Sequence, residues 1–176
     1  MKATGVVRRI DELGRIVIPK ELRKTLRIKE GENLEIYIDG ENIVLKKYSV
    51  MNNLDDFAQE LTDSIYGLLK KNILIMDRDS VIAASGDLKK KYLGKQISSA
   101  MEEYMKRRDS MLEKYSKKIK IIENIEEEGA YAYSPIIASG DAVGLVIMFS
   151  KEEQLGKNEE QIVKIVANFL AKHLEQ

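Results

Sequence analysis

The chain has 176 residues, of which 44% are hydrophobic and 33% charged, and its 29 Lys and Arg residues balance 29 Asp and Glu residues. It contains no cysteine, which excludes disulfides, thiolate catalysis, cysteine-ligated zinc and iron–sulfur clusters. The longest nearly unbroken apolar run, residues 142–149, is too short to cross a bilayer, and the N-terminus lacks the apolar core of a signal peptide. We therefore expect a cytoplasmic protein without a membrane segment.

Positive charge is concentrated at the start of the chain. The first 29 residues hold nine Lys or Arg and three Asp or Glu. Residues 1–50 carry 11 basic and 8 acidic residues, whereas the remainder carries 18 and 21. A basic segment in a neutral chain indicates a surface for a polyanion, although a solvated basic face is the alternative.

The first elements in chain order are a hairpin and a short helix. Residues 3–10 and 15–18 predict two strands joined by a turn at residues 11–14, where Gly14 can adopt a positive φ. Pro19 ends strand pairing and can open a helix, which we expect over residues 20–27.

A second hairpin follows, with strands over residues 34–38 and 42–47 around Asp39-Gly40. Four strands in about 50 residues cannot bury enough surface to be stable alone without disulfides or metals. We therefore expect an obligate dimer through residues 1–50, in which hairpins of two chains close one barrel.

Residues 48–53 lack periodicity and form a predicted boundary between domains at 1–50 and 54–176. Beyond it the pattern predicts a helix over 55–71, strands over 72–77 and 81–85, a loop with a short helix over 86–94, a helix over 98–108, strands over 119–125, 130–137 and 142–149, and a helix over 158–174. This order predicts an α+β fold, an antiparallel sheet flanked by helices. The charged residues 98–118 are interpreted as solvated helix and loop.

Four basic residues are candidates for DNA contact: Arg8, Arg15, Arg23 and Lys24. The first two lie on the two arms of the first hairpin and the others on the short helix. Arginine offers a planar fork to phosphates and guanine edges, and a two-stranded ribbon can enter a major groove. The structural alternative is ion pairing with Asp11, Glu12 and Glu21.

The segment VRRIDELGRIVIPKELRKTLRI, followed by EGENLEIYIDGENIVLKKY, resembles the AbrB-type swapped-hairpin domain of bacterial transition-state regulators over residues 1–48. The resemblance implies an intertwined dimeric β-barrel that binds AT-rich double-stranded promoter DNA through Arg8, Arg15, Arg23 and Lys24. One departure is Arg27, where close relatives often have glycine. Such domains recognise DNA partly through its shape and deformability.

The NILIMDRDSVIAASGD hairpin and the YLGKQIS segment, with the order of elements, resemble a GAF domain. The combination of the two domains resembles sporulation regulators of spore-forming bacilli. That resemblance implies a cytoplasmic transcription regulator that both activates and represses genes, assembled as a homotetramer from two dimers. The helices over 55–71 and 158–174 have apolar faces wide enough for the sheet and for a neighbouring subunit.

A GAF-like pocket between the sheet and residues 77–99 is the candidate site for a small effector, and a packed domain that serves only assembly is the alternative. No cofactor or metal is predicted. The usual cyclic-nucleotide motif of GAF domains is not evident, and without a cysteine the chain cannot hold a thioether-linked bilin. His173, the only histidine, lies on the last helix, where we expect it to be exposed and not a haem ligand.

Two other functions remain open. AbrB-like domains also occur in antitoxins that neutralise a toxin partner, but these typically carry a short disordered tail, and the tail here is long enough to form a domain. An enzyme is the other alternative. Because the sequence shows no nucleophile–base pair, metal cluster or phosphate loop, we expect no catalytic activity.

Overall fold

The computed structural model describes residues 4–175 and divides the chain into two compact units, Met1–Tyr48 and Ser49–Gln176. The predicted boundaries were 1–50 and 54–176. Residues 1–3, where the first predicted strand begins, and residue 176, where the second predicted domain ends, lie outside the described residues.

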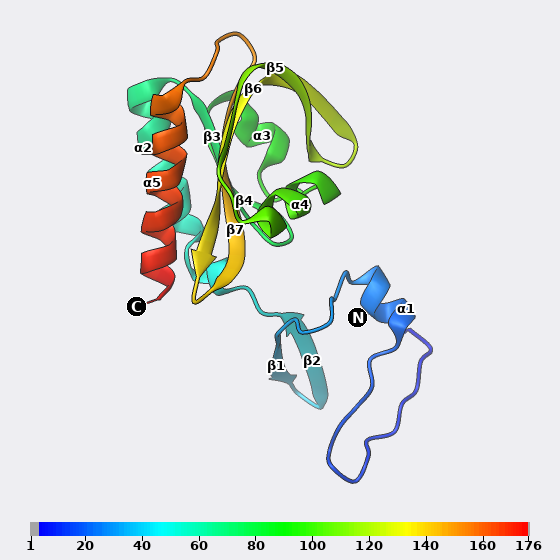
Figure 1. Cartoon of the computed structure of the whole chain (residues 1–176). Helices are drawn as coiled ribbons and strands as arrows, with labels where there is room; N and C mark the ends of the chain where they lie inside the picture. The colour runs from blue at the N-terminus through cyan, green and yellow to red at the C-terminus, as the bar shows by residue number, and fades with distance from the viewer. Residues whose placement is uncertain (1–3, 176) are drawn as a thin grey trace. The chain divides into compact units, whose positions relative to one another are not determined.

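The N-terminal unit contains one short helix and one hairpin (Figure 1). Helix α1 spans Lys20–Thr25. Strands β1 (Leu34–Asp39) and β2 (Asn42–Lys47) pair antiparallel, with Asp39 opposite Asn42. The turn between them holds Gly40 at φ +60°, a conformation that favours glycine. The second predicted hairpin is therefore confirmed.

The first predicted hairpin is not a ladder in the single chain. No strand is assigned to residues 4–18, and only the turn around Asp11 is closed by hydrogen bonds. The arms carry exposed apolar side chains, such as Val7 (85% exposed) and Val17 (73% exposed). Within the described residues of the unit, only Pro19 is buried. A ribbon without a core to pack on has little to hold its strands together.

The C-terminal unit contains an antiparallel five-stranded sheet in the order β4-β3-β7-β6-β5. Its elements are η1 (Val50–Asn53), α2 (Asp55–Leu69), β3 (Asn72–Asp77), β4 (Val81–Ala84), η2 (Gly86–Leu88), α3 (Lys89–Tyr92), α4 (Ser99–Arg107), β5 (Met111–Ile122), β6 (Ile125–Ala138), β7 (Asp141–Ser150) and α5 (Lys157–Leu174). The predicted order of helices and strands is confirmed.

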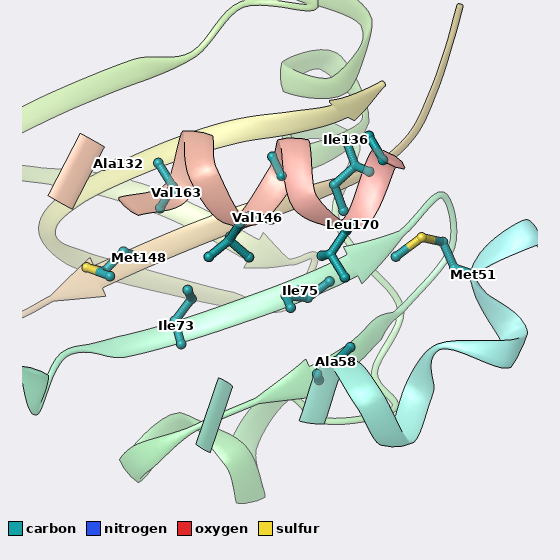
Figure 2. Close-up of a cluster of buried hydrophobic side chains, with 14 of the residues drawn as sticks. Met51, Ala58, Ile73, Ile75, Ala132, Ile136, Val146, Met148, Val163 and Leu170 are labelled. Atoms are coloured by element: carbon teal, nitrogen blue, oxygen red, sulfur yellow. The ribbon is translucent and has the colours of Figure 1, made fainter. Parts of the chain in front are cut away.

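Helices α2 and α5 lie side by side on one face of the sheet, and α3 and α4 lie on the other (Figure 1). Side chains alternate between the two faces along each strand. Ile73 and Ile75 of β3 pack under α2 and α5, whereas Leu74 and Met76 point to the side of α3 and α4. Figure 2 shows the first cluster, with Ile73, Ile75, Val146 and Met148 from the sheet beneath Val163 and Leu170 of α5.

The interpretation of residues 98–118 as solvated helix and loop is confirmed for the helix, α4, and wrong for residues 111–118, which belong to strand β5. This strand begins at Met111, eight residues before the expected strand over 119–125, and forms one edge of the sheet. Its residues 114–118 include exposed Lys114, Lys117 and Lys118 in place of apolar residues. Pairing with β6, which is buried over most of its length, holds these charged residues in a strand despite their composition.

Candidate nucleic-acid interface

The tip of the first hairpin is built by Asp11. The Gly14 N–H donates to the Asp11 carbonyl (2.9 Å), and the Asp11 N–H donates to the Arg15 carbonyl (3.0 Å). The Asp11 carboxylate accepts the backbone N–H groups of Leu13 (3.0 Å) and Arg15 (2.8 Å). Gly14 sits at φ +75°. An Asp at the start of the turn and a Gly at its end therefore fix the loop without any support from a core.

The same carboxylate orients the Arg15 side chain. Arg15 Nε donates to Asp11 Oδ2 at 2.7 Å, while the Arg15 side chain remains 71% exposed. The backbone N–H of Arg15, and then its guanidinium, hold the pKa of Asp11 below its usual value. The ion pair that the sequence allowed as an alternative is thus present. An exposed ion pair contributes little to folding stability. Its effect here is to orient the guanidinium, which stays accessible to a phosphate.

Arg8 lies on the opposite arm. It is exposed, and among residues 4–175 its guanidinium donates only to the neighbouring Val7 carbonyl (3.1 Å). Within residues 4–175 it forms no ion pair with an acidic side chain. Its positive charge is therefore directed to solvent.

Helix α1 supplies the other two candidates. Lys24 is exposed, while Arg23 is half-buried, and Arg23 Nε is buried without a hydrogen-bond partner among the residues that the structure describes. The Ile28 N–H donates to the Arg23 carbonyl (2.7 Å), which closes the helix with Arg27 at φ +53°. This left-handed position favours glycine, which fits the glycine that the family resemblance implies there.

No hydrogen bond or ion pair joins the four candidate side chains to one another within the described part of a single chain. The sequence places Asp11 in the turn and offers it as a competing partner for the arginines. The structure makes it the residue that positions Arg15, and the signal for this role was an Asp three residues before a turn glycine.

The effector pocket expected around residues 77–99 stays a prediction, because part of this segment packs into the core of the C-terminal unit. Leu88, Tyr92, Ile97 and Met101 are each at most 4% exposed and pack against the sheet. His173 is exposed, and its ring stacks on Phe57 at 5.1 Å between centroids. Among the described residues, no group of three His, Asp or Glu side chains could hold a metal ion. None of the described helices is long and apolar enough to span a membrane.

Two family models match the chain. Residues 53–175 match the family described as "Stage V sporulation protein T C-terminal, transcription factor". Residues 7–51 match the family described as "Antidote-toxin recognition MazE, bacterial antitoxin".

Similar proteins cover the whole chain and each part. Stage V sporulation protein T of Bacillus subtilis is 49% identical over the full length of both chains. The transition state regulatory protein AbrB of the same organism is 67% identical over 48 residues, which are 27% of this chain and 50% of AbrB. The GAF domain of a phosphoenolpyruvate-protein phosphotransferase from Coxiella burnetii is 16% identical, covers 69% of this chain and 82% of its own, and gives a TM-score of 0.55. The GAF-like fold of the C-terminal unit is thereby confirmed.

Proposed function

The chain belongs to the stage V sporulation protein T family of transcription factors, and from this premise we infer that it regulates sporulation genes by binding DNA through its AbrB-like N-terminal unit. The observation that carries this function is the Arg15 guanidinium, held by Asp11 at the tip of a basic hairpin yet 71% exposed. A fixed, accessible guanidinium suits recognition of a phosphate or a guanine edge.

We propose that Arg8, Arg15, Arg23 and Lys24 contact double-stranded promoter DNA. Arg8 and Lys24 are exposed, so their positive charges face solvent. The buried Arg23 Nε has no hydrogen-bond partner within the described residues. Phosphate contacts would give affinity, and DNA shape would give preference for AT-rich promoters. We further propose that the protein acts in the cytoplasm as an activator at some promoters and a repressor at others.

A second copy of the chain is the proposed partner of the N-terminal unit. Side chains that a folded domain would bury are largely exposed here, including Ile10 (66%), Ile38 (84%) and Ile43 (72%). Burying this surface against a partner stabilises both chains by about 25 cal/mol per Å² of apolar area. We propose that the arms of residues 4–18, which lack strand pairing in one chain, become strands of an intertwined barrel in the dimer.

The outer faces of α2 and α5 are the proposed surface for a tetramer. Leu68 (85% exposed), Ile165 (64%) and Phe169 (49%) lie outside the core that these helices share with the sheet. The Phe57 and Phe169 rings, 5.7 Å apart, continue this apolar surface across both helices. Two such helix pairs can close a four-helix bundle, which would join two DNA-binding dimers.

An antitoxin function is the alternative that the match over residues 7–51 favours. That match covers about a quarter of the chain, whereas the sporulation relative covers all of it. Co-purification of a small toxin with the protein would favour the alternative. We propose no catalytic role for either unit.

The function is tested by measuring binding of the full chain to an AT-rich promoter fragment across a salt series. We expect log Kd to change steeply, by about 0.9 per phosphate contact for each unit of log salt concentration. The full-length variant Ile165→Glu should bind more weakly if the C-terminal helices couple two dimers, because coupling raises the effective concentration of the second dimer. Binding that is absent, or that ignores salt, contradicts the regulator function.

A further inference from the structure

A groove of about 330 Å³ opens in the C-terminal unit where β7 ends and β3 begins. It is lined by Tyr66, Lys70, Lys71, Asn72, Asp87, Leu88, Lys91, Phe149 and residues 150–153. Four of these residues are lysines. Asp87, Leu88 and Lys91 belong to the segment 77–99, so the groove borders the core around Tyr92 and Ile97. Its volume is at the lower end of the range for small-molecule sites.

Asn72 lines this groove with a side-chain amide whose oxygen is not held by a hydrogen bond within the described residues. Its Oδ1 is buried without a hydrogen-bond partner within the described residues, and it lies against Gly86, where an added Cβ would come within 2.0 Å. The same added Cβ would lie 2.4 Å from the Tyr66 ring. An amide can exchange the places of its oxygen and nitrogen by a half turn, and an anionic ligand selects the orientation in which the NH2 group donates to it.

Lys71 already binds a carboxylate that an external anion could replace. Its ammonium pairs with Glu153, whose side chain is 67% exposed while that of Lys71 is only 17% exposed. The lysine is therefore held in place, and its partner lies on the solvent side. An exposed partner forms a weak pair and is readily exchanged.

Two more lysines are fixed at the groove by a buried carboxylate. Glu127, which is 5% exposed, accepts from Lys91, from Lys151 (2.8 Å) and from the Tyr92 hydroxyl (2.5 Å). Both lysines line the groove. Their ammonium groups are thus held by a residue outside the groove and can still donate to a ligand.

We propose that this groove binds a small anion with several negative charges, a polycarboxylate or a phosphate compound, which displaces Glu153 from Lys71 and accepts a hydrogen bond from the Asn72 amide. Asp87 and Glu152 also line the groove and oppose binding, so Glu153 acts as the internal competitor of the ligand. This site goes beyond DNA recognition and gives the C-terminal unit a ligand of its own.

The test is calorimetric titration of the full chain, without DNA, with citrate in one series and pyrophosphate in another, both at low ionic strength. Glu153→Gln removes the competitor and should tighten binding about tenfold, the effect of one hydrogen bond to a charged group. Lys71→Gln and Asn72→Ala, each made in the Glu153→Gln chain, should each weaken binding about tenfold.

Lys90→Gln is the matched control, because Lys90 is an exposed lysine on the same helix as Lys91 but does not line the groove. It should leave binding unchanged. Thermal unfolding of each variant verifies the fold, and Asn72→Ala tests the site without changing charge. Binding of citrate alone assigns carboxylates, binding of pyrophosphate alone assigns phosphates, and binding of both assigns a site that recognises charge. Equal affinities for the parent chain and Glu153→Gln, or equal losses in Lys71→Gln and Lys90→Gln, would overturn the proposal.

Discussion

The Asp11 carboxylate binds Arg15 twice, through the backbone N–H at 2.8 Å and through Nε at 2.7 Å. One residue thus closes the turn and orients the guanidinium that the turn presents. Asp11 thus holds both the backbone and the side chain of Arg15, so substitutions of Asp11 and of Arg15 should have different effects.

Replacing Arg15 by Ala should weaken DNA binding and leave folding intact, because the guanidinium is exposed and its ion pair contributes little stability. In a dimer the change removes two contacts. The slope of log Kd against log salt concentration should therefore fall by the amount that corresponds to about two phosphate contacts. Filter binding across a salt series measures this slope. Lys114→Ala, which removes an exposed charge from the C-terminal unit, should change neither slope nor affinity, and an Arg15→Ala chain that unfolds would instead identify a structural residue.

Replacing Arg27 by Gly should raise the free energy of unfolding by up to about 1 kcal/mol, because Arg27 holds φ +53° at the end of α1 and glycine adopts this conformation without steric cost. The greater freedom of glycine in the unfolded chain offsets part of the gain. Urea unfolding at a fixed protein concentration measures the effect. Arg27→Ala keeps the strain while losing the charge, so it should not be stabilised; equal stabilities of the two variants would exclude backbone strain as the cause.

Glu127 should make the C-terminal unit sensitive to acid. Burial raises the pKa of Glu127, but the hydrogen bonds from Lys151, Lys91 and Tyr92 outweigh burial and lower it to about 2, from an ordinary value of 4.5. A lowered pKa in the folded state means that this stability is present above pH 4.5 and is lost as the pH falls towards 2.

Glu127→Gln should therefore lower stability at pH 7 by about 2 kcal/mol and flatten the loss of stability between pH 4.5 and pH 2. Urea unfolding as a function of pH measures both effects. Glu126→Gln, on the adjacent residue, removes an exposed pair with Lys118 (2.8 Å) and should change stability little. A Glu127→Gln chain with the acid sensitivity of the parent would show that other carboxylates cause it.

Ile165→Glu should dissociate the proposed tetramer into dimers, since it places a charge on the exposed apolar face of α5, where Ile165 is 64% exposed. Losing the burial of one isoleucine weakens the contact by about 2 kcal/mol per chain. Sedimentation equilibrium measures the mass. The core under α5 is formed by other residues, such as Val163 and Leu170, so the fold should persist. A parent chain that is already dimeric would remove the tetramer from the proposed function.

The sequence predicts the elements whose signal is local. Asp39-Gly40 identifies the β1–β2 hairpin, and the apolar periodicity of residues 158–174 identifies α5 within one residue of its start. The start of strand β5 at Met111 could not be predicted, because pairing with β6, and not their own strand propensity, holds its charged residues in an extended conformation. The role of Asp11 follows from turn chemistry, whereas the groove at Asn72 depends on contacts among segments far apart in the sequence.

The lysines of β5 have a consequence for the protein at high concentration. An edge strand leaves one row of backbone N–H and C=O groups able to pair with a strand of another molecule. Lys114, Lys117 and Lys118 are exposed on this strand, next to Lys120, and Lys117 and Lys118 pair with Glu113 and Glu126. A second copy approaching strand to strand would have to desolvate these charged side chains. These charges therefore oppose growth of the largest sheet by strand addition at β5, and they leave the proposed contacts through apolar helices and hairpins unaffected.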